Sequence, residues 1–385
     1  MARSLHPGDP ELKSGLPESV LEKPVQVEVP ELELKGVSKS FSGMRAVDRC
    51  DLSIGRGEML VLLGASGCGK STLLNLIAGF ETPDSGTVSM RGKVVNDTPP
   101  HRRNVALVFQ HYALFPHMTI TENIAYGLHA RKMDKSDIAA RVAEVVSLLK
   151  LNGLEDRYPA QLSGGQRQRA AVARALAIKP DMLLLDEAFS ALDRNLREDM
   201  QLEFSLLLRR LSVTTVIVTH DQREAFSMAD RIAVMEGGRI AQVGSPEDVY
   251  RKPETTSVFR FLGTINQFKA TALVDSQGSA LRVGEGIQFE PAFSLDGFAN
   301  GSEVTFDVRA EDIAVSETPT SIHKTNPAVV TLRTFLGPQE RIVLDFGGEQ
   351  VLVDRPAQLS FHPIQVGQKL YIDFDSRRSR ISCRN

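Results

Sequence analysis

The chain has 385 residues, which is long for one domain and favours two. Its formal net charge at pH 7 is −3, so no global basic field would attract nucleic acid. No apolar run approaches the ~18–20 residues of a membrane helix, and the three cysteines form no C-x-x-C pair that would favour a zinc site.

Residues 1–30 are polar and contain five prolines. They lack the apolar core of a signal peptide, so we expect a disordered lead and a cytoplasmic protein. Residues 31–37 alternate polar and apolar side chains and predict a half-buried strand, followed by a turn at residues 39–43. Residues 50–54 predict a second strand, and residues 55–58 predict a hairpin turn into the next one.

Phe41 lies in the expected turn, shortly before a glycine-rich loop. A flat ring at that place could stack on the adenine of a bound nucleotide. The same side chain could pack in the core instead, and the residue pattern alone leaves both interpretations open.

The glycine-rich loop at residues 64–71 fits G-x-x-x-x-G-K-[ST] at every fixed position. An apolar strand at residues 58–63 precedes it, and a helix over residues 72–78 follows and stops at Gly79. In this context the loop predicts a nucleoside triphosphate site, with Lys70 reaching the β- and γ-phosphates and Ser71 on Mg²⁺. The residues expected to line the nucleotide here are Gly64, Ala65, Ser66, Gly67, Cys68, Gly69, Lys70, Ser71 and Thr72.

The segment that follows predicts two short strands, at residues 87–90 and 93–95, and a buried strand at residues 105–109. Gln110 stands at the end of the buried strand, where parallel sheets place ligand contacts. The aromatic loop after it, residues 111–118, indicates either a partner surface or inward packing.

A helix over residues 137–151 is expected next, because apolar residues repeat there at three and four and Asn152-Gly153 ends the pattern. Its position between sheet strands indicates an inserted helical subdomain. Ser163, Gly164 and Gly165 then lead, through Gln166, into an alanine-rich helix over residues 170–177. Small side chains and free N–H groups at a helix start predict a second anion site.

The motifs in this order resemble those of ATP-binding cassette (ABC) ATPases over residues 32–265. The resemblance includes Asp186 and Glu187 after the buried strand from Met182, residues 190–193 as a dimer-contact loop, and His220 after a strand at residues 215–219. It implies an α/β P-loop fold with a RecA-like core and a helical subdomain. Ala188 stands where the family usually has proline.

The resemblance also implies roles for single residues. Glu187 would be the general base on water and His220 would brace the γ-phosphate of ATP. Ser71, Gln110 and Asp186 would be the Mg²⁺ ligands, and Phe41 would stack on adenine. The family works as a head-to-tail pair, so the residues that would complete the nucleotide site of a second copy are Ser163, Gly164, Gly165, Gln166 and Asp193.

The rest of the chain predicts a hairpin at residues 231–243, a helix capped by Ser245 with Pro246 at its first position, and a short helix over residues 257–262. From Asn266 onward, short β-like runs split by Gly and Pro predict a small β-barrel. Leu336-Gly337 and residues 309–312, Arg-Ala-Glu-Asp, resemble the paired oligomer-binding-type (TOBE) β domain at the tail of importer cassettes.

We therefore expect a lead at residues 1–30, an ABC ATPase domain at residues 31–263 and an OB-like TOBE domain at residues 264–385. The resemblance implies an ATP- and Mg²⁺-dependent subunit, peripheral at the cytoplasmic face of the membrane. Its partners would be a second ATPase subunit, two transmembrane permease subunits and, indirectly, an external solute-binding protein.

The solute is left open by the sequence. Residues 109–118 are similar to loops of polyamine, sulfate, iron and phosphonate importer ATPases. Among these, residues 197–203 slightly favour the polyamine importer ATPases. A non-transport ABC ATPase of DNA repair or translation is the alternative, although the coiled coil, zinc insert or second cassette typical of that class is not seen. A nucleic-acid-binding barrel is disfavoured because only residues 377–380 form a basic cluster.

Overall fold

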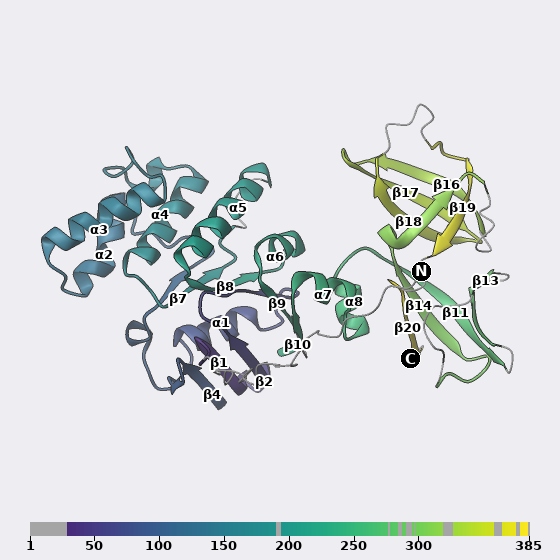
Figure 1. The fold of residues 1–385 in the computed structure, drawn as a ribbon, viewed down its shortest axis with the longest axis horizontal. Helices are drawn as coiled ribbons and strands as arrows, with labels where there is room; N and C mark the ends of the chain where they lie inside the picture. Colours follow the sequence, from purple (N-terminus) through teal and green to yellow (C-terminus); the bar gives the residue numbers. More distant parts are fainter. Residues whose placement is uncertain are drawn as a thin grey trace, which may run out of the picture.

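The computed structural model describes residues 29–189, 194–275, 278–283, 287–289, 295, 297–318, 326–357, 364–374 and 378–383. The predictions for residues 1–28 of the lead and for the loop at residues 190–193 lie outside these residues. The described chain has an α/β part and an all-β tail (Figure 1). Within it, no helix is both long and apolar enough to cross a membrane.

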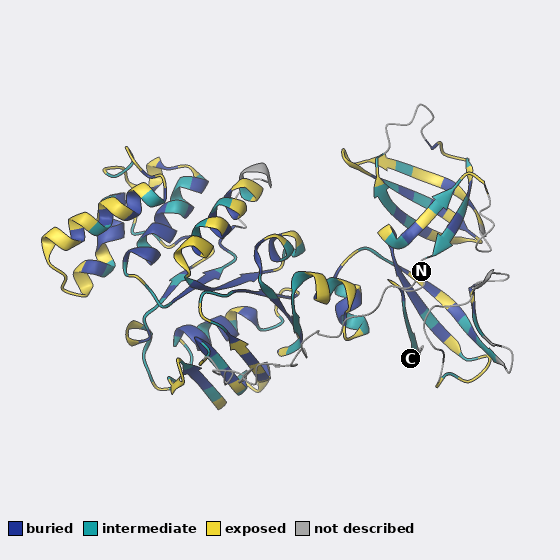
Figure 2. Ribbon diagram, viewed as in Figure 1, coloured by how far each residue is buried: buried dark blue, intermediate teal, exposed yellow. Residues whose placement is uncertain are grey.

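A six-stranded sheet with the order β10-β9-β3-β8-β7-β6 forms the centre of the α/β part. Five of its strands run parallel, and β10 pairs antiparallel with β9 at one edge. The strands are β3 (Met59–Leu63), β6 (Val105–Val108), β7 (Met182–Asp186), β8 (Thr214–Thr219), β9 (Arg231–Glu236) and β10 (Arg239–Gly244). Figure 2 shows the inner strands dark, and the unbroken burial along β3 and β8 is typical of parallel strands covered on both faces.

A second, antiparallel sheet with the order β2-β1-β4-β5 lies beside the first. Its strands are β1 (Leu32–Phe41), β2 (Met44–Ile54), β4 (Ser85–Met90) and β5 (Lys93–Val94). Helix α1 (Lys70–Ala78) lies between the two sheets, and its apolar side chains share one core with both. This arrangement holds the glycine-rich loop, which precedes α1, at the junction of the two sheets (Figure 1).

Two expectations for this region are wrong. The turn expected at residues 39–43 is only Ser42-Gly43, because β1 continues to Phe41 and pairs there with Met44. The expected hairpin at residues 55–58 does not form either. β2 and β3 belong to different sheets, so this turn carries the chain from one sheet to the other. Burial alternates along β2 and is continuous along β3, as expected for an antiparallel strand with one covered face and a parallel strand with two.

The expected helical subdomain is present between β6 and β7 (Figure 1). It contains α2 (Ile120–Ala130), α3 (Lys135–Leu148), the short turn η2 (Pro159–Gln161) and α4 (Gly164–Ala177). Another short turn, η1 (Pro100–Arg102), lies before β6, outside this subdomain. Helix α3 begins and ends two to three residues earlier than predicted, and α4 begins at Gly164 rather than Ala170. Helix α5 (Arg194–Leu211) follows β7.

Helix α2 was not predicted, although its start carries a recognisable signal. Thr119 accepts a hydrogen bond from the backbone N–H of Glu122, and the Glu122 carboxylate accepts one from the Thr119 N–H. The pattern Thr-x-x-Glu before an apolar run is a capping box. It marks the start of α2 in the sequence.

The tail is all-β, as predicted, and divides into two five-stranded sheets, β13-β12-β11-β14-β20 and β15-β19-β16-β17-β18. Both sheets contribute to one apolar core, in which Phe268 and Phe306 meet Phe374. The elements are β11 (Ile265–Asp275), β12 (Gly278–Val283), β13 (Ile287–Phe289), β14 (Glu303–Arg309), η3 (Ala310–Asp312), β15 (Ile313–Ser316), β16 (Asn326–Phe335), β17 (Gln339–Phe346), β18 (Glu349–Pro356), β19 (Lys369–Phe374) and β20 (Arg380–Cys383).

Helix α6 (Gln222–Met228) joins β8 to β9 within the α/β part, and two short helices, α7 (Pro246–Arg251) and α8 (Thr256–Phe261), connect this part to the tail. Ser245 caps α7 and Pro246 takes its first position, as predicted. Arg309 of the tail motif lies between two rings, with its guanidinium carbon 3.8 Å from the Tyr250 centroid and 4.6 Å from that of Phe259. These contacts attach the tail to α7 and α8.

Candidate active site

The candidate residues gather at one edge of the six-stranded sheet. β3, β8, β7 and β6 are adjacent and parallel, so their carboxyl ends meet at the same edge. The glycine-rich loop follows β3, His220 follows β8, Glu187 follows β7 and Gln110 lies just beyond β6. This is the edge at which open α/β sheets bind ligands.

The glycine-rich loop requires its glycines because backbone approaches backbone there. A Cβ at Gly64 would lie 2.4 Å from the Met235 carbonyl oxygen, and one at Gly69 would lie 2.2 Å from that of Ala46. Gly69 also has φ 106° at the start of α1, a conformation that a larger residue rarely adopts. The loop is therefore closely packed against β2 and β9 and has no space for side chains at these positions.

Lys70 points back into this loop and is only 5% exposed. Its ammonium donates hydrogen bonds of 2.8 Å to the carbonyl oxygens of Gly64 and Ala65. The charge is thus already held within the loop by backbone dipoles, where an incoming phosphate oxygen could replace a carbonyl as its partner.

Ser71 and Asp186 face each other across the space between α1 and β7, with the Ser71 hydroxyl donating to Asp186 Oδ1 at 3.4 Å. The pKa of Asp186 is raised above its usual value, mainly by burial and also by the neighbouring charge of Glu187. The Ser71 hydrogen bond and the charge of Lys70 offset part of this increase. A hydroxyl oxygen, a carboxylate oxygen and the nearby amide oxygen of Gln110 are hard oxygen donors, so the residues present fit Mg²⁺.

Glu187 joins three strands of the sheet through hydrogen bonds. Its backbone N–H donates to the Val218 carbonyl at 3.0 Å, and its φ of 47° turns the side chain away from the strand direction. Gln110 Nε2 donates to one carboxylate oxygen at 3.3 Å, and His220 Nδ1 lies 3.1 Å from the other. Ala188, which stands in place of proline, is fully buried.

Phe41 lies at the end of β1, is 43% exposed, and has the Lys39 ammonium 5.4 Å from its ring centroid. This exposure excludes the core-packing alternative. The β1–β2 hairpin that carries Phe41 also contains Ala46, whose carbonyl oxygen adjoins Gly69 of the glycine-rich loop. The ring is therefore exposed on the hairpin that packs against this loop.

The Ser163 motif forms a regular helix start. The Ser163 hydroxyl accepts from the Gln166 N–H at 3.3 Å, and the Gln166 side-chain oxygen accepts from the Ser163 N–H at 2.9 Å. Gly165 is buried beneath this cap, whereas Ser163 is exposed. These two hydrogen bonds lie within the start of α4, and Asp193 lies outside the described residues.

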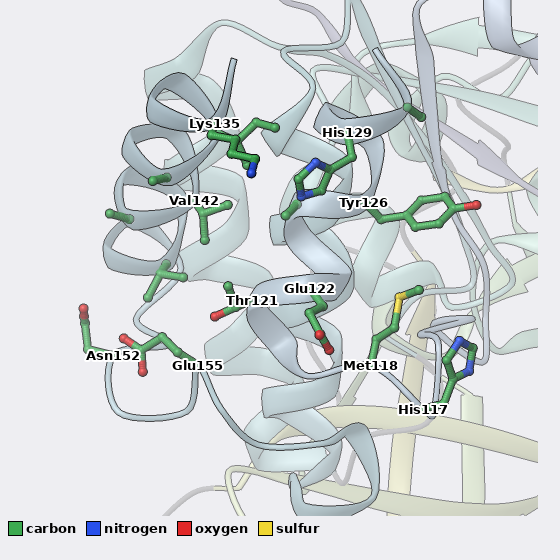
Figure 3. A pocket seen from close by; sticks show the side chains of 16 residues that line it. His117, Met118, Thr121, Glu122, Tyr126, His129, Lys135, Val142, Asn152 and Glu155 are labelled. Carbon is green, nitrogen blue, oxygen red and sulfur yellow. The ribbon is translucent and has the colours of Figure 1, made fainter. Parts of the chain in front are cut away.

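The aromatic loop after Gln110 packs inward only in part, since His111, Ala113, Pro116 and His117 are exposed. Tyr112 is only 6% exposed, Leu114 packs against the main core, and the Phe115 ring lies 4.5 Å from that of Tyr126. The end of the loop, at His117 and Met118, instead borders a groove of about 1080 Å³ between α2 and α3 (Figure 3). Of the two interpretations of this loop, inward packing holds for Tyr112, Leu114 and Phe115.

Glu224 is a buried carboxylate near the site that the sequence analysis missed. It is 3% exposed, and the Thr219 hydroxyl donates to its Oε2 at 2.7 Å. Burial raises the pKa of Glu224 to about 7. The pattern Asp221-x-x-Glu224 signals a helix start in the sequence, but nothing in it shows that the carboxylate faces inward.

A glycine-rich phosphate loop, paired carboxylates at the end of a buried strand, and a histidine at the next strand end define the class of ABC ATPases. The family model "ABC transporter" matches residues 47–190, and the model "TOBE domain" matches residues 296–381. The chain belongs to the family of ABC import ATP-binding proteins and is an ATP-hydrolysing transporter ATPase.

Two curated relatives are named spermidine/putrescine import ATP-binding protein PotA. The protein of Oleidesulfovibrio alaskensis is 50% identical over 282 residues, which are 73% of this chain and 75% of the relative. That of Vibrio cholerae is 45% identical over 309 residues, or 80% and 82% of the two chains. The dimeric structure of the ATP-binding cassette MJ0796 bound to ADP and Pi matches with a TM-score of 0.51 at 31% identity, over 56% of this chain and 98% of that one.

Proposed function

We propose that this chain is the ATPase subunit that energises a polyamine importer, with spermidine or putrescine as the transported solute. The contacts of Glu187 with Gln110 and His220 beside the phosphate loop carry the ATPase assignment. The names of its relatives support the solute. Sulfate, iron and phosphonate importers remain the alternatives that the loop after Gln110 suggests, and no contact in the structure favours one of them.

ATP is the proposed nucleotide, with Lys70 and the loop amides binding its β- and γ-phosphates and Phe41 stacking on adenine. Ser71, Gln110 and Asp186 are the residues that would hold Mg²⁺. When bound, the ion supplies charge neutralisation on the phosphate oxygens. The remaining work of catalysis is positioning, which the rigid edge of the sheet is suited to provide.

Glu187 is the proposed general base, because its carboxylate lies at the same sheet edge as the phosphate loop and contacts Gln110 and His220, which follow the two neighbouring strands. A carboxylate oriented by Gln110 and His220 can take a proton from a water molecule placed in line with the γ-phosphate. His220 would in turn brace the γ-phosphate, since its ring is half exposed at the edge of the sheet.

The proposed working form is a head-to-tail dimer. The start of α4 presents backbone N–H groups at a helix N-terminus, and a triphosphate needs donors on more than one side. Ser163 to Gln166, with Asp193, would therefore close over ATP held by the partner. The dimeric state of the matched MJ0796 cassette, which is bound to ADP and Pi, supports this arrangement.

The groove between α2 and α3 is the proposed docking place of the transmembrane permease subunits (Figure 3). Its walls are mainly apolar side chains of both helices, and it begins where the loop after Gln110 ends. Movement of a partner in this groove could thus displace Gln110, a proposed Mg²⁺ ligand, because only about eight loop residues separate the two. The protein would lie at the cytoplasmic face of the membrane, and an external binding protein would deliver the solute.

Uptake of radiolabelled solutes tests this function. Cells that lack the gene should lose spermidine and putrescine uptake and regain it with the wild-type chain but not with Glu187→Gln. Uptake of sulfate, iron or a phosphonate should not change. Restoration of one of these solutes in place of polyamines would reassign the importer, and no change in any uptake would contradict a transport role.

A further inference from the structure

The loop after Gln110 contains two consecutive residues in the left-handed region. Tyr112 has φ 64° and Ala113 has φ 46°, although neither is glycine. Non-glycine residues in this conformation store strain and persist only when surrounding contacts hold them. The contacts that hold these two residues therefore determine the path of the chain just after a proposed Mg²⁺ ligand.

Arg174 of α4 provides such contacts. One arm of its guanidinium donates to the Ala113 carbonyl at 2.8 Å, and the other donates to the Tyr112 carbonyl at 3.0 Å. The guanidinium carbon also lies 5.4 Å from the centroid of the Phe115 ring. A planar fork that holds two successive carbonyls sets the orientation of the strained peptide, which a single point charge cannot do.

Asn123 of α2 holds the next part of the same loop and is completely buried. Its side-chain oxygen accepts from the Phe115 N–H at 2.8 Å, and its amide nitrogen donates to the carbonyls of Phe115 and Met118 at 3.1 and 3.2 Å. The loop is thus fastened to the helical subdomain at both α2 and α4. Gln110, at its other end, contacts Glu187 of the central sheet.

We propose that Arg174 is a positioning residue for the ATPase reaction, which sets the place of Gln110 by holding the strained loop onto α4. The inference rests on the proposed role of Gln110 as a Mg²⁺ ligand. Helix α4 also begins at the Ser163 cap, which is proposed to close over the partner's ATP. One helix would thus link the partner's nucleotide site to the loop that positions Gln110 in its own site.

Arg141 offers a matched control for the effect of losing a half-buried guanidinium fork. It lies on α3 in the same subdomain and also donates to two successive backbone carbonyls, those of Leu176 at 2.6 Å and Ala177 at 3.0 Å. Its hydrogen bonds end at the carboxyl end of α4 and not at the Gln110 loop. Arg174→Lys and Arg141→Lys therefore remove comparable contacts, and only the first is expected to affect Gln110.

The first measurement is the dissociation constant of ATP with and without Mg²⁺, by equilibrium binding to the full chain. We expect Mg²⁺ to tighten ATP binding by wild type and Arg141→Lys equally. Arg174→Lys should bind metal-free ATP as wild type does. The factor by which Mg²⁺ lowers its dissociation constant for ATP should be about tenfold smaller than in wild type, equivalent to about 1.4 kcal/mol. Gln110→Ala should lose the same gain, and adding Arg174→Lys to it should cause no further loss.

Hydrogen exchange supplies a readout independent of the metal. Amides of residues 109–118 should exchange faster in Arg174→Lys than in wild type or Arg141→Lys, without a general loss of protection. A full Mg²⁺ gain in Arg174→Lys, or a loss that adds completely to that of Gln110→Ala, overturns the inference while Gln110 keeps its role. An unchanged gain in Gln110→Ala would instead reject the ligand assignment of the proposed function, and the inference with it.

Discussion

Phe41 shows how one exposed side chain can indicate a binding role. Its ring lies at the surface of the β1–β2 hairpin that packs against the phosphate loop, where burial contributes little to the stability of the fold. We expect Phe41→Ala to weaken ATP binding by roughly tenfold, because stacking on one aromatic ring is worth ~1–3 kcal/mol. Equilibrium binding checks this, with Phe80→Ala, another exposed phenylalanine, as the control. Equal affinities in all three proteins would remove Phe41 from the site.

Glu224 makes a prediction about pH. Burial raises its pKa from 4.5 to about 7, so the folded protein holds this proton more tightly than the unfolded chain. The contribution of the protonated Glu224 carboxyl to the free energy of unfolding is therefore fully present below about pH 4.5 and is lost as the pH rises through about 7. Glu224→Gln stays neutral, and its stability relative to wild type should rise by roughly 2–3 kcal/mol between about pH 5 and pH 8.

Urea denaturation of both proteins across this range measures the difference. Glu247→Gln replaces an exposed carboxylate on α7 and should show no comparable trend. A constant difference between wild type and Glu224→Gln from pH 5 to pH 8 would show that this carboxylate ionises freely in the folded protein.

At the scale of elements, the groove between α2 and α3 can be tested without disturbing the core. Ala139 lines the groove on α3, and its neighbour Ala140 is equally exposed but does not line it. Both positions tolerate glutamate in a helix. Ala139→Glu should abolish stimulation of the ATPase by reconstituted permease subunits, whereas Ala140→Glu should retain it, and both should bind ATP.

Leu114 and Phe115 are less suitable for this test, because Leu114 packs against the core and Phe115 is half-buried against Tyr126, so charged replacements would also destabilise the fold. Normal stimulation of Ala139→Glu in the reconstituted assembly would mean that the permease subunits bind elsewhere. The central sheet and site should be unaffected in either variant, which thermal unfolding of the isolated chain can verify.

Much of the architecture was predictable because local patterns agree with the fold. The β3, phosphate loop and α1 unit carries its own glycine and strand signals, and Ser245 and Pro246 mark α7 unambiguously. The contacts of Glu187 with Gln110 and His220 were not predictable from residue patterns, because they depend on the order β8-β7-β6 in the sheet. The continuation of β1 from the predicted residues 31–37 to Phe41 was not predictable, since this end of the strand is partly exposed and lacks a burial pattern.

At the scale of the whole molecule, the composite site predicts complementation between chains. Lys70→Ala removes the phosphate-binding ammonium, and Ser163→Arg blocks the start of α4; each variant should be inactive alone. In a mixed dimer one site carries both changes and the other carries none. Mixing should therefore restore partial ATPase activity if one intact site can turn over.

A control places both changes in one chain and mixes it with wild type, so that each site carries one lesion and stays inactive. Since Ser163 also caps α4, its replacement costs roughly 1 kcal/mol of stability and each variant must first be shown to be folded. A mixture as inactive as its components, although mixed dimers demonstrably form, would contradict the shared site.

The most direct measurement of the central claim is phosphate release by Glu187→Gln beside wild type, with ATP binding determined on the same samples. Glutamine keeps the shape that Gln110 and His220 surround but cannot accept a proton from water. We predict ATP binding close to that of wild type and turnover lower by at least about 100-fold. Turnover near the wild-type rate would show that this carboxylate is not the general base and that the chemistry lies elsewhere.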